Sequence, residues 1–458
     1  MTRPAYIGDN RTAKGWLGSY IPTGAVIRER LLDGSTFLLG GFMIASAVAQ
    51  LYMMLMSRLL PTVDYGTLVA LTSLSYFLAV LARTIQIWVI KVVAETKDAG
   101  SGQLYLIFDL VMRVLLPIGG TVLAVDWIAR DWIAAFLHLD SVTPVVVLGL
   151  YAFAALVIPV PVGILLGLGR LRLASAVIVL ESVFRLLAGT GLVYLSLGAG
   201  GAMFGYAAGS LMAFAVGLLP LLPMLVRGHR SAPDTAEFGG FGSFTLLGFV
   251  INACLIFIGT IDQVIVKHYF SAEIAGNFAV AFLLGQIIAI ATISFAWVVF
   301  ARSAAMRADD PKRARLLVNS LLATGAFAVV MTLGYLIAPN LAVLVMGGSR
   351  YSSASGYLGL EGIEMTLFAL VYVQAYYLMS VKQMRVAWLL LAAVVAEVVL
   401  ADLYHWTVQQ YLLTHILVLA GLLACVSVIS LRHFRTESVL SPVGMPDRSI
   451  YSQLDEVI

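Results

Sequence analysis

Apolar and polar residues follow one another along this chain in blocks. Twelve apolar blocks, separated by short polar connections, each approach the length of about 20 residues that crosses a bilayer. In the first half these blocks are Ser35–Ser57, Thr67–Ile90, Gln103–Val125, Thr143–Gly167, Leu173–Leu195 and Ala202–Val226. In the second half they are Phe244–Val266, Asn277–Phe300, Leu316–Ala338, Tyr357–Val381, Val386–Leu403 and Gln410–Leu431. Because lipid offers an exposed backbone no hydrogen-bond partner, the pattern predicts an all-α integral membrane protein with about twelve transmembrane helices.

Composition agrees with this interpretation. The chain of 458 residues is 61% hydrophobic and 12% charged, with a mean hydropathy of +0.96. Soluble domains are typically about 45–50% apolar and about 25% charged. The first 34 residues are polar and have no apolar core, so we expect a tail there and not a cleaved signal peptide. The net charge of +3 reflects orientation in the membrane, and we expect no nucleic-acid partner.

Lysine and arginine predict which side of the membrane each connection faces. With the amino terminus inside, the outer connections hold only Arg58, Arg130, Lys267 and Arg350. Arg83, Arg113 and Arg185 lie within spans, and the remaining 21 of the 28 basic residues are cytoplasmic. The positive-inside rule then places both termini in the cytoplasm, in the inner (cytoplasmic) membrane of the cell. The longest outer connections, near Asp126–Val142 and Pro339–Gly356, are too short to fold as a catalytic domain.

One sequence string occurs twice. RLLPTVDYG, from Arg58 to Gly66, returns in altered form as HYFSAEIAG, from His268 to Gly276, at an offset of 210 residues. Membrane proteins that repeat in halves are commonly transporters, with the substrate path between the halves. The link 227–243 contains proline, glycine and charge and divides the chain. We predict a tail at 1–34, six-helix bundles at 35–226 and 244–431, and a second tail at 432–458, both tails and the link being cytoplasmic.

Three stretches resemble one family. MSRLLPTVDYGTLVALTSLSYFL (Met56–Leu78) is similar to the first-loop region of bacterial polysaccharide and O-antigen flippases. GTIDQVIVKHYFSAEIAGNFAVAFLLGQII (Gly259–Ile288) resembles their seventh and eighth helices, and VMGGSRYSSASGYLGL (Val345–Leu360) resembles the loop before the tenth. These flippases share a superfamily with the multidrug and toxic compound exporters and the peptidoglycan-precursor flippase. Helix number and spacing agree with that family from Ser35 to Leu431.

The resemblance implies two six-helix bundles around a central cavity that opens alternately to each face. Helices one, two, seven and eight would line it. The implied substrate is a lipid diphosphate carrying a sugar repeat unit, moved to the outer leaflet for capsule, exopolysaccharide or O-antigen assembly. The implied partners are that lipid-linked oligosaccharide, membrane lipid, and a polymerase or other polysaccharide-assembly proteins.

Charges within apolar spans are candidate functional residues, since each costs about 2.5–3.5 kcal/mol on insertion scales. Arg83 has no acid three or four positions away, and its planar guanidinium could grip a phosphate or extend to the interface. Asp262 could carry protons or could pair with Lys267. With Arg58, which begins the first copy of the repeat, these residues form the predicted substrate-binding set: Arg83, Asp262, Arg58 and Lys267.

Other intramembrane charges have local partners or peripheral positions. Asp109 with Arg113, and Glu181 with Arg185, are spaced i, i+4 and meet on one helix face, so we expect them to neutralise each other, with substrate contact as the alternative. A buried structural hydrogen bond is expected at Glu397. Glu361 and Glu364 are expected on a solvated rim.

Several chemistries have no signature in this chain. No metal-ligand spacing, no glycine-rich phosphate loop and no catalytic triad pattern occurs, so we expect no cofactor, no metal site and no enzyme activity. A multidrug exporter of the same superfamily is the alternative, and it would have a more acidic, apolar cavity. An integral-membrane polymerase or ligase would need a large outer loop.

Overall fold

The computed structural model describes residues 34–95, 101–231, 243–306 and 312–440, and all elements in these ranges are helical. Ten helices are long and apolar enough to cross a membrane, and two further bent pairs bring the number of spans to twelve. The bent pairs are Thr62–Phe77 with Val80–Glu95, at 43°, and Gly248–Thr260 with Asp262–Tyr269, at 47°. The chain is therefore an all-α, multi-pass membrane protein.

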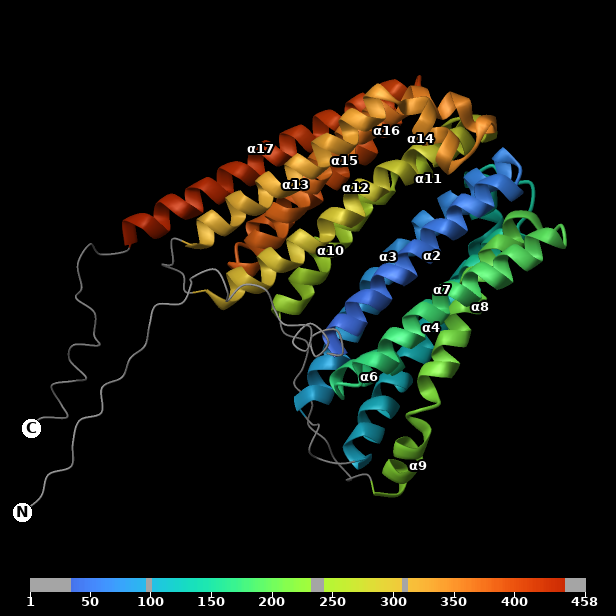
Figure 1. Cartoon of the computed structure of the whole chain (residues 1–458), viewed down its shortest axis with the longest axis vertical. Coiled ribbons are helices and arrows are strands. Elements are labelled where there is room, and N and C mark those ends of the chain that lie inside the picture. The colour runs from blue at the N-terminus through green and yellow to red at the C-terminus, as the bar shows by residue number, and fades with distance from the viewer. Residues whose placement is uncertain (1–33, 96–100, 232–242, 307–311, 441–458) are drawn as a thin grey trace, which may run out of the picture.

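The helices form two bundles (Figure 1). The N-bundle consists of α2 (Gly34–Leu59), α3 (Thr62–Glu95), α4 (Ser101–Phe136), α5 (Thr143–Val157), α6 (Pro159–Gly167), α7 (Leu171–Tyr194), α8 (Gly198–Leu218) and α9 (Leu222–Ser231). The C-bundle consists of α10 (Ser243–Thr260), α11 (Asp262–Tyr269), α12 (Ala272–Ala305), α13 (Lys312–Ile337), α14 (Pro339–Met346), the 3-10 turn η1 (Ser349–Ala354), α15 (Ser355–Ser380), α16 (Arg385–Leu403) and α17 (Val408–Leu440).

The bundles meet at one end and diverge at the other, where α2 begins and α17 ends (Figure 1). At the meeting end, α3 packs against α10, α11 and α12. One apolar core continues across this contact from Tyr65 and Leu68 into Val266 and Phe278. A second core, around Val89, stays within the N-bundle near its diverging end. The bundles thus share an apolar core at the closed end.

The repeated strings face each other at this closed end. Gly66 of α3 and Gly276 of α12, the last residues of the two copies, lie back to back: a Cβ on Gly66 would be 2.9 Å from the Cα of Gly276. Only glycine allows two helix backbones to approach so closely. The repeat therefore marks the point where the two halves cross.

Several helices extend beyond the predicted spans. The outer connection near Asp126–Val142 is helical as far as Phe136, and the one near Pro339–Gly356 forms α14 and η1. Hydropathy detects the part of a helix that lipid covers, whereas the helix itself ends only where its backbone bonds stop. Proline divides the fourth span at Pro159, because its ring removes an N–H donor.

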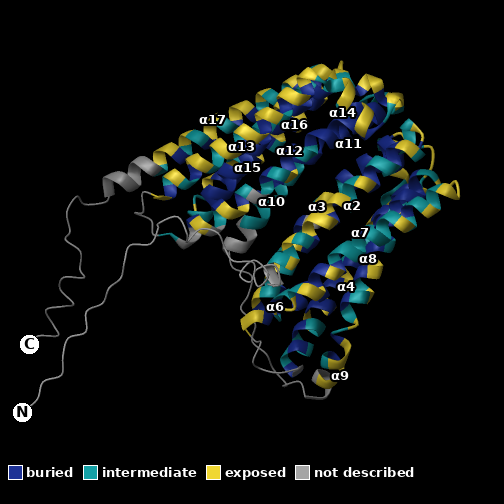
Figure 2. Cartoon of the chain, in the orientation of Figure 1, coloured by how far each residue is buried: buried dark blue, intermediate teal, exposed yellow. Residues whose placement is uncertain are grey.

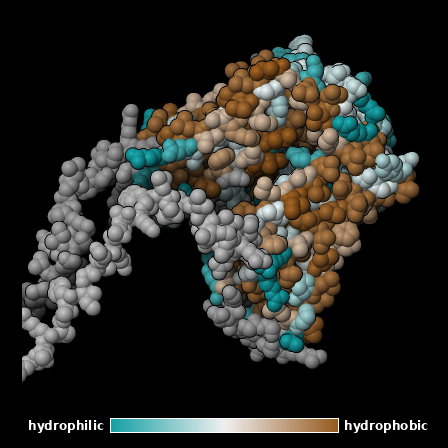
Figure 3. Space-filling model, viewed as in Figure 1, coloured by the Kyte–Doolittle hydropathy of each residue, from teal (hydrophilic) through white to brown (hydrophobic). Residues whose placement is uncertain are grey.

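Apolar side chains dominate the outer faces of both bundles. Exposed residues are frequent on the outward sides of α13 and α17, and buried ones lie between helices (Figure 2). Many exposed residues are large and hydrophobic, among them Ile128, Val330 and Leu417. Hydrophobic colour covers most of the visible side, and hydrophilic residues gather towards the ends (Figure 3). Such a belt suits contact with lipid tails.

Candidate functional site

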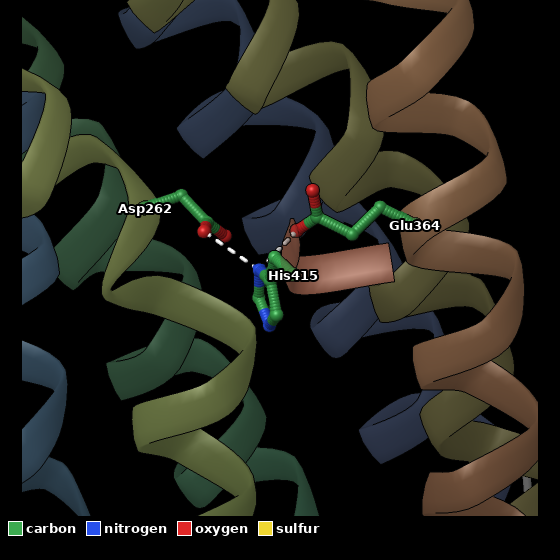
Figure 4. Close-up of side chains that lie close together, drawn as sticks. All are labelled: Asp262, Glu364 and His415. Carbon is green, nitrogen blue, oxygen red and sulfur yellow. Dashed lines mark hydrogen bonds and ion pairs between the residues drawn. The ribbon is translucent and has the colours of Figure 1, made fainter. Parts of the chain in front are cut away.

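A cluster of ionisable residues lies completely buried inside the C-bundle. Asp262 begins α11 directly after the bend in the seventh span, Glu364 lies on α15, Glu397 on α16 and His415 on α17. The exposed fraction of each residue is 2% or less. Asp262, Glu364 and His415 point towards one another from three helices (Figure 4). We call these four residues the acid–histidine cluster.

His415 connects the members of the cluster. Its Nδ1 lies 2.8 Å from Asp262 Oδ1 and 3.0 Å from Glu364 Oε1, and its Nε2 lies 3.3 Å from Glu397 Oε1. The hydroxyl of Tyr411, one turn before His415, donates to Asp262 Oδ1 at 2.5 Å. One imidazole therefore lies within 3.3 Å of three carboxyl groups, and one of these groups also accepts a hydrogen bond from a phenol.

The cluster holds more acid than its base can neutralise. Full ionisation would leave three carboxylates beside one imidazolium, and Glu361, also buried, has no hydrogen-bond partner among the described residues for either oxygen. Uncompensated charge is very costly at such depth, so buried charges are paired, protonated or bound to a cation. The arrangement can therefore hold either shared protons or a cation.

The spacing favours protons over a metal. Asp262, Glu364 and His415 offer ligand atoms within 4.8 Å of one another, the kind of group that can bind an ion. However, tetrahedral ligands about 2.0 Å from a zinc ion lie about 3.3 Å apart. The 2.8 Å separation between His415 Nδ1 and Asp262 Oδ1 is a hydrogen bond, which a metal would have to break, and Glu364 Oε1 lies 3.0 Å from the same nitrogen. In this conformation the His415 imidazole lies close enough to three carboxyl groups to exchange protons with them.

Several residues of this cluster differ from their sequence-based interpretation. Asp262 pairs with His415 and Tyr411, not with Lys267. Glu361 and Glu364 are completely buried, so their assignment to a solvated rim is wrong. That error arose because the outer end of the tenth span packs against α12 and α13, which hydropathy does not report. Glu397 is buried as expected, but in place of the expected hydrogen bond its Oε1 lies 3.3 Å from His415 Nε2, and neither of its oxygens has a hydrogen-bond partner among the described residues.

Arg83 lies on α3 with its side chain exposed. No described residue offers it an ion pair or hydrogen bond. It interacts electrostatically with Tyr372 and Tyr376 of α15, in the opposite bundle. These two rings stack 4.8 Å apart, and Tyr376 donates to Asn252 Oδ1 at 2.6 Å. Arg83 is therefore an exposed cation of the N-bundle within electrostatic range of polar groups of the C-bundle.

Arg58 lies at the closed end, and its partners belong to the other bundle. Its Nη2 donates to the Val345 carbonyl at 3.0 Å, near the end of α14. Reciprocally, Arg350 Nη1 donates to the Leu60 carbonyl, just after α2, at 2.9 Å. Each arginine thus satisfies carbonyl groups at a helix C-terminus of the opposite bundle, where positive charge is favourable.

Lys267 is also at the closed end but is fully buried. Its Nζ has no hydrogen-bond partner among the described residues, and it interacts electrostatically with Asp64 and Asp140 of the N-bundle. The neighbouring His268 donates from Nδ1 to the Phe136 carbonyl at 2.6 Å. The four predicted site residues therefore do not form one site: two seal the closed end, one enters the buried cluster and one faces the open end.

The two local pairs form as expected. Arg113 Nη2 lies 2.8 Å from Asp109 Oδ2, and Arg185 Nη2 lies 3.0 Å from Glu181 Oε1. Their surroundings differ: the Arg113 side chain is 76% exposed, and that of Arg185 is 14% exposed.

Comparison with solved structures shows which known proteins share this fold. No protein-family model matches the sequence, and no curated protein does. Among solved structures, an inward-facing multidrug resistance MATE family transporter of the MOP superfamily aligns with a TM-score of 0.62 at 13% identity, covering 88% of this chain and 96% of its own. The lipid II flippase MurJ in an inward closed conformation gives 0.62 at 11%, covering 91% and 95%. An outward-facing MATE family transporter gives 0.53 at 15%, covering 89% and 97%. The chain has the fold of these transporters.

Proposed function

We propose that this protein is a transporter of the MOP superfamily that acts as a flippase, moving lipid diphosphate-linked oligosaccharide repeat units across the cytoplasmic membrane for capsule, exopolysaccharide or O-antigen assembly. The observation that carries the proposal is Arg83, a permanently charged, exposed group of the N-bundle without an acidic partner among the described residues. An arginine can bind a phosphate through two parallel hydrogen bonds. A cationic group in this position favours an anionic headgroup.

The conformation suits loading from the cytoplasm. If both termini are cytoplasmic, the bundles diverge towards the cytoplasmic side (Figure 1). Arg83 is exposed in the second half of α3. The higher TM-score to the inward-facing transporter, 0.62 against 0.53 for the outward-facing one, agrees with this orientation. Arg58 and Lys267 would meet the substrate only after the closed end separates. The product would then pass to a polymerase or another assembly protein.

A multidrug exporter of the same fold is the second candidate. The structural likeness does not separate the two, since the TM-scores to the MATE transporter and to MurJ are both 0.62. The charge that each kind of substrate requires distinguishes the two candidates. Cationic drugs favour an acidic cavity, whereas the acids of the acid–histidine cluster are buried inside the C-bundle. A membrane-embedded polymerase or ligase is disfavoured, because the outer connections form short helices and no folded domain.

The test is flipping by purified, reconstituted protein. In liposomes containing a fluorescent lipid diphosphate-linked oligosaccharide, we expect the wild type to equilibrate the leaflets. Arg83→Ala should slow this at least tenfold, and Arg83→Lys should recover only part of the rate because lysine forms a single-point contact. Arg113→Lys, in the same bundle but exposed and paired, is the matched control and should leave the rate unchanged. Ethidium efflux by the wild type without lipid flipping would favour the exporter.

We further propose that the acid–histidine cluster couples transport to protons. Asp262 precedes Gln263, whose Nε2 donates to the carbonyls of Gly66 and Ala275 at 3.3 and 3.1 Å. Neighbouring residues of one short helix thus join the cluster to the contact between the bundles. A change in the protons held at Asp262 would alter the anchoring of α11 to α17, and with it the closed end.

Coupling is measured by imposing a pH gradient on the same liposomes. The wild type should accumulate substrate in one leaflet in response to the gradient. Glu364→Gln, which removes one proton site without changing side-chain shape, should flip substrate without responding to the gradient. A sodium gradient that drives the wild type, with no response to pH, would refute proton coupling and leave the flippase assignment standing.

A further inference from the structure

The N-bundle contains a second polar cluster, built from an ion pair and tyrosine rings. Glu181 Oε1 accepts hydrogen bonds from Arg185 at 3.0 Å and from Ser210 at 3.3 Å. The guanidinium carbon of Arg185 lies 4.4 Å from the ring centre of Tyr206. Tyr206 in turn contacts the ring of Tyr151, with centroids 5.2 Å apart.

This cluster adjoins α3, the helix that carries Arg83. Tyr76 interacts electrostatically with both Arg185 and Arg83, and its side chain is 43% exposed. Tyr76 and Arg83 are seven residues apart, one on each side of the 43° bend in α3, and both are exposed. Tyr76 is the member nearer the closed end. A ligand held at Arg83 and extending inward would reach Tyr76 and then Arg185.

The ion pair retains unused hydrogen-bonding capacity. Arg185 Nε is buried and has no partner among the described residues, and the side chains of Arg185 and Glu181 are 14% and 22% exposed. A pair whose role is only structural would be expected to satisfy its buried donors. Arg185 and Glu181 instead offer adjacent donors and acceptors beside aromatic faces.

We propose that Tyr76, Tyr151, Arg185 and Glu181 form a carbohydrate subsite that receives the sugar adjoining the diphosphate at Arg83. A sugar presents apolar C–H faces, which stack on aromatic rings, and a rim of hydroxyl groups, which pair with a guanidinium and a carboxylate. Because Glu181 neutralises Arg185, the subsite suits a neutral sugar, whereas Arg83 suits the phosphates. This assignment rests on the proposed flippase function and divides the substrate between two stations, Arg83 on α3 and the subsite formed by α3, α5 and α7.

Binding to purified protein in nanodiscs separates the two stations. The probes are farnesyl diphosphate and farnesyl diphosphate bearing one glucose, galactose or N-acetylglucosamine. The wild type should bind at least one glycosylated probe five or more times more tightly than farnesyl diphosphate. Tyr76→Ala, at a partly exposed position, should abolish this preference while keeping the affinity for farnesyl diphosphate within twofold. Arg83→Ala should weaken the binding of all probes by the same factor.

A second variant distinguishes loss of the subsite from misfolding. The pair substitution Glu181→Gln with Arg185→Met keeps volume and leaves no lone charge, and it should also abolish the sugar preference. The matched control is Asp109→Asn with Arg113→Met, the exposed pair on α4, which should retain it. A wild type without sugar preference, or a preference that survives both Tyr76→Ala and the Glu181–Arg185 double variant, would overturn the subsite while leaving the flippase function intact. Failure of the wild type to bind any probe would overturn both.

Discussion

The contact between Gly66 and Gly276 predicts that a single methyl group can open the closed end. In Gly66→Ala, the new Cβ would lie 2.9 Å from both the Cα and the N of Gly276, and 3.2 Å from the carbonyl carbon of Ala275. Carbon atoms pack at about 3.5–4.0 Å. All three neighbours are backbone atoms of α12, so no side-chain rotation can relieve the overlap, and the two helices must move apart.

The size of the expected shift depends on the conformation in which the contact exists. Overpacking by one methyl group in a well-packed site typically costs about 1–3 kcal/mol. This cost applies to the conformation in which α3 and α12 cross closely, and it is absent once the bundles separate there. Gly66→Ala should therefore shift the equilibrium towards a form open at this end by about 5- to 150-fold.

Spin-label distances measure the shift directly. Asp131 near the end of α4 and Trp406 after α16 are both well exposed, and they lie on opposite bundles at the closed end. With Asp131→Cys and Trp406→Cys in a background lacking Cys254 and Cys425, Gly66→Ala should add a longer-distance population. Gly120→Ala on α4, where a Cβ meets nothing within 4 Å, is the matched control and should leave the distances unchanged.

Two outcomes would refute this reasoning. If Gly66→Ala and Gly120→Ala give the same distances as the wild type, the close crossing does not hold the end shut. If Gly66→Ala lowers thermal stability without adding a longer distance, the contact supports the fold and not the conformational equilibrium.

Further predictions concern orientation and the buried charges. Reporter fusions after Ser231 and Asp309 should report cytoplasm and a fusion after Ser349 the outside, and a reversed result at any of them would break the twelve-span topology. Losing Arg185 alone should lower the melting temperature more than losing Arg113 alone, because breaking a buried pair costs about 3–5 kcal/mol and breaking an exposed pair less than about 1 kcal/mol. The double variants of each pair should recover much of the loss. His415→Ala should destabilise the protein strongly, because three buried carboxyl groups lose their shared partner, and adding Glu397→Gln should restore part of the melting temperature.

The number and type of helices followed from hydropathy because lipid enforces both. The fold class is confirmed, and all twelve predicted spans fall on helices. The predicted sixth span, Ala202–Val226, is shorter in the structure, because α8 ends at Leu218 and α9 begins only at Leu222. Hydropathy missed the helical continuation from Asp126 to Phe136, since that part of α4 leaves the apolar block while keeping its backbone bonds. It also missed the break at Ile261, where α11 begins with Asp262.

Local pairs were predictable and distant ones were not. Glu181 and Arg185 lie four residues apart on one helix, so spacing alone predicted their contact. Asp262 and His415 are 153 residues apart, and nothing in their neighbourhoods connects them. The repeat of Gly66 and Gly276 was visible in the sequence, but its meaning, a crossing of backbones between the halves, needed the arrangement of α3 and α12.

A signal for the acid–histidine cluster was nevertheless present in the sequence. Asp262, Glu364, Glu397 and His415 each lie in or next to an apolar span, and each such placement is costly. Treated one at a time, the three acids suggested proton carriage or a pairing with Lys267 at Asp262, a solvated rim at Glu364 and a structural hydrogen bond at Glu397. The four ionisable groups lie in the seventh, tenth, eleventh and twelfth spans of one bundle. Burial penalises an unpaired charge more than a paired one, so the free-energy cost of burying all four is lowest when they contact one another. The co-occurrence of unexplained charges within one half of a repeated membrane protein is therefore stronger evidence for a common site than any single residue.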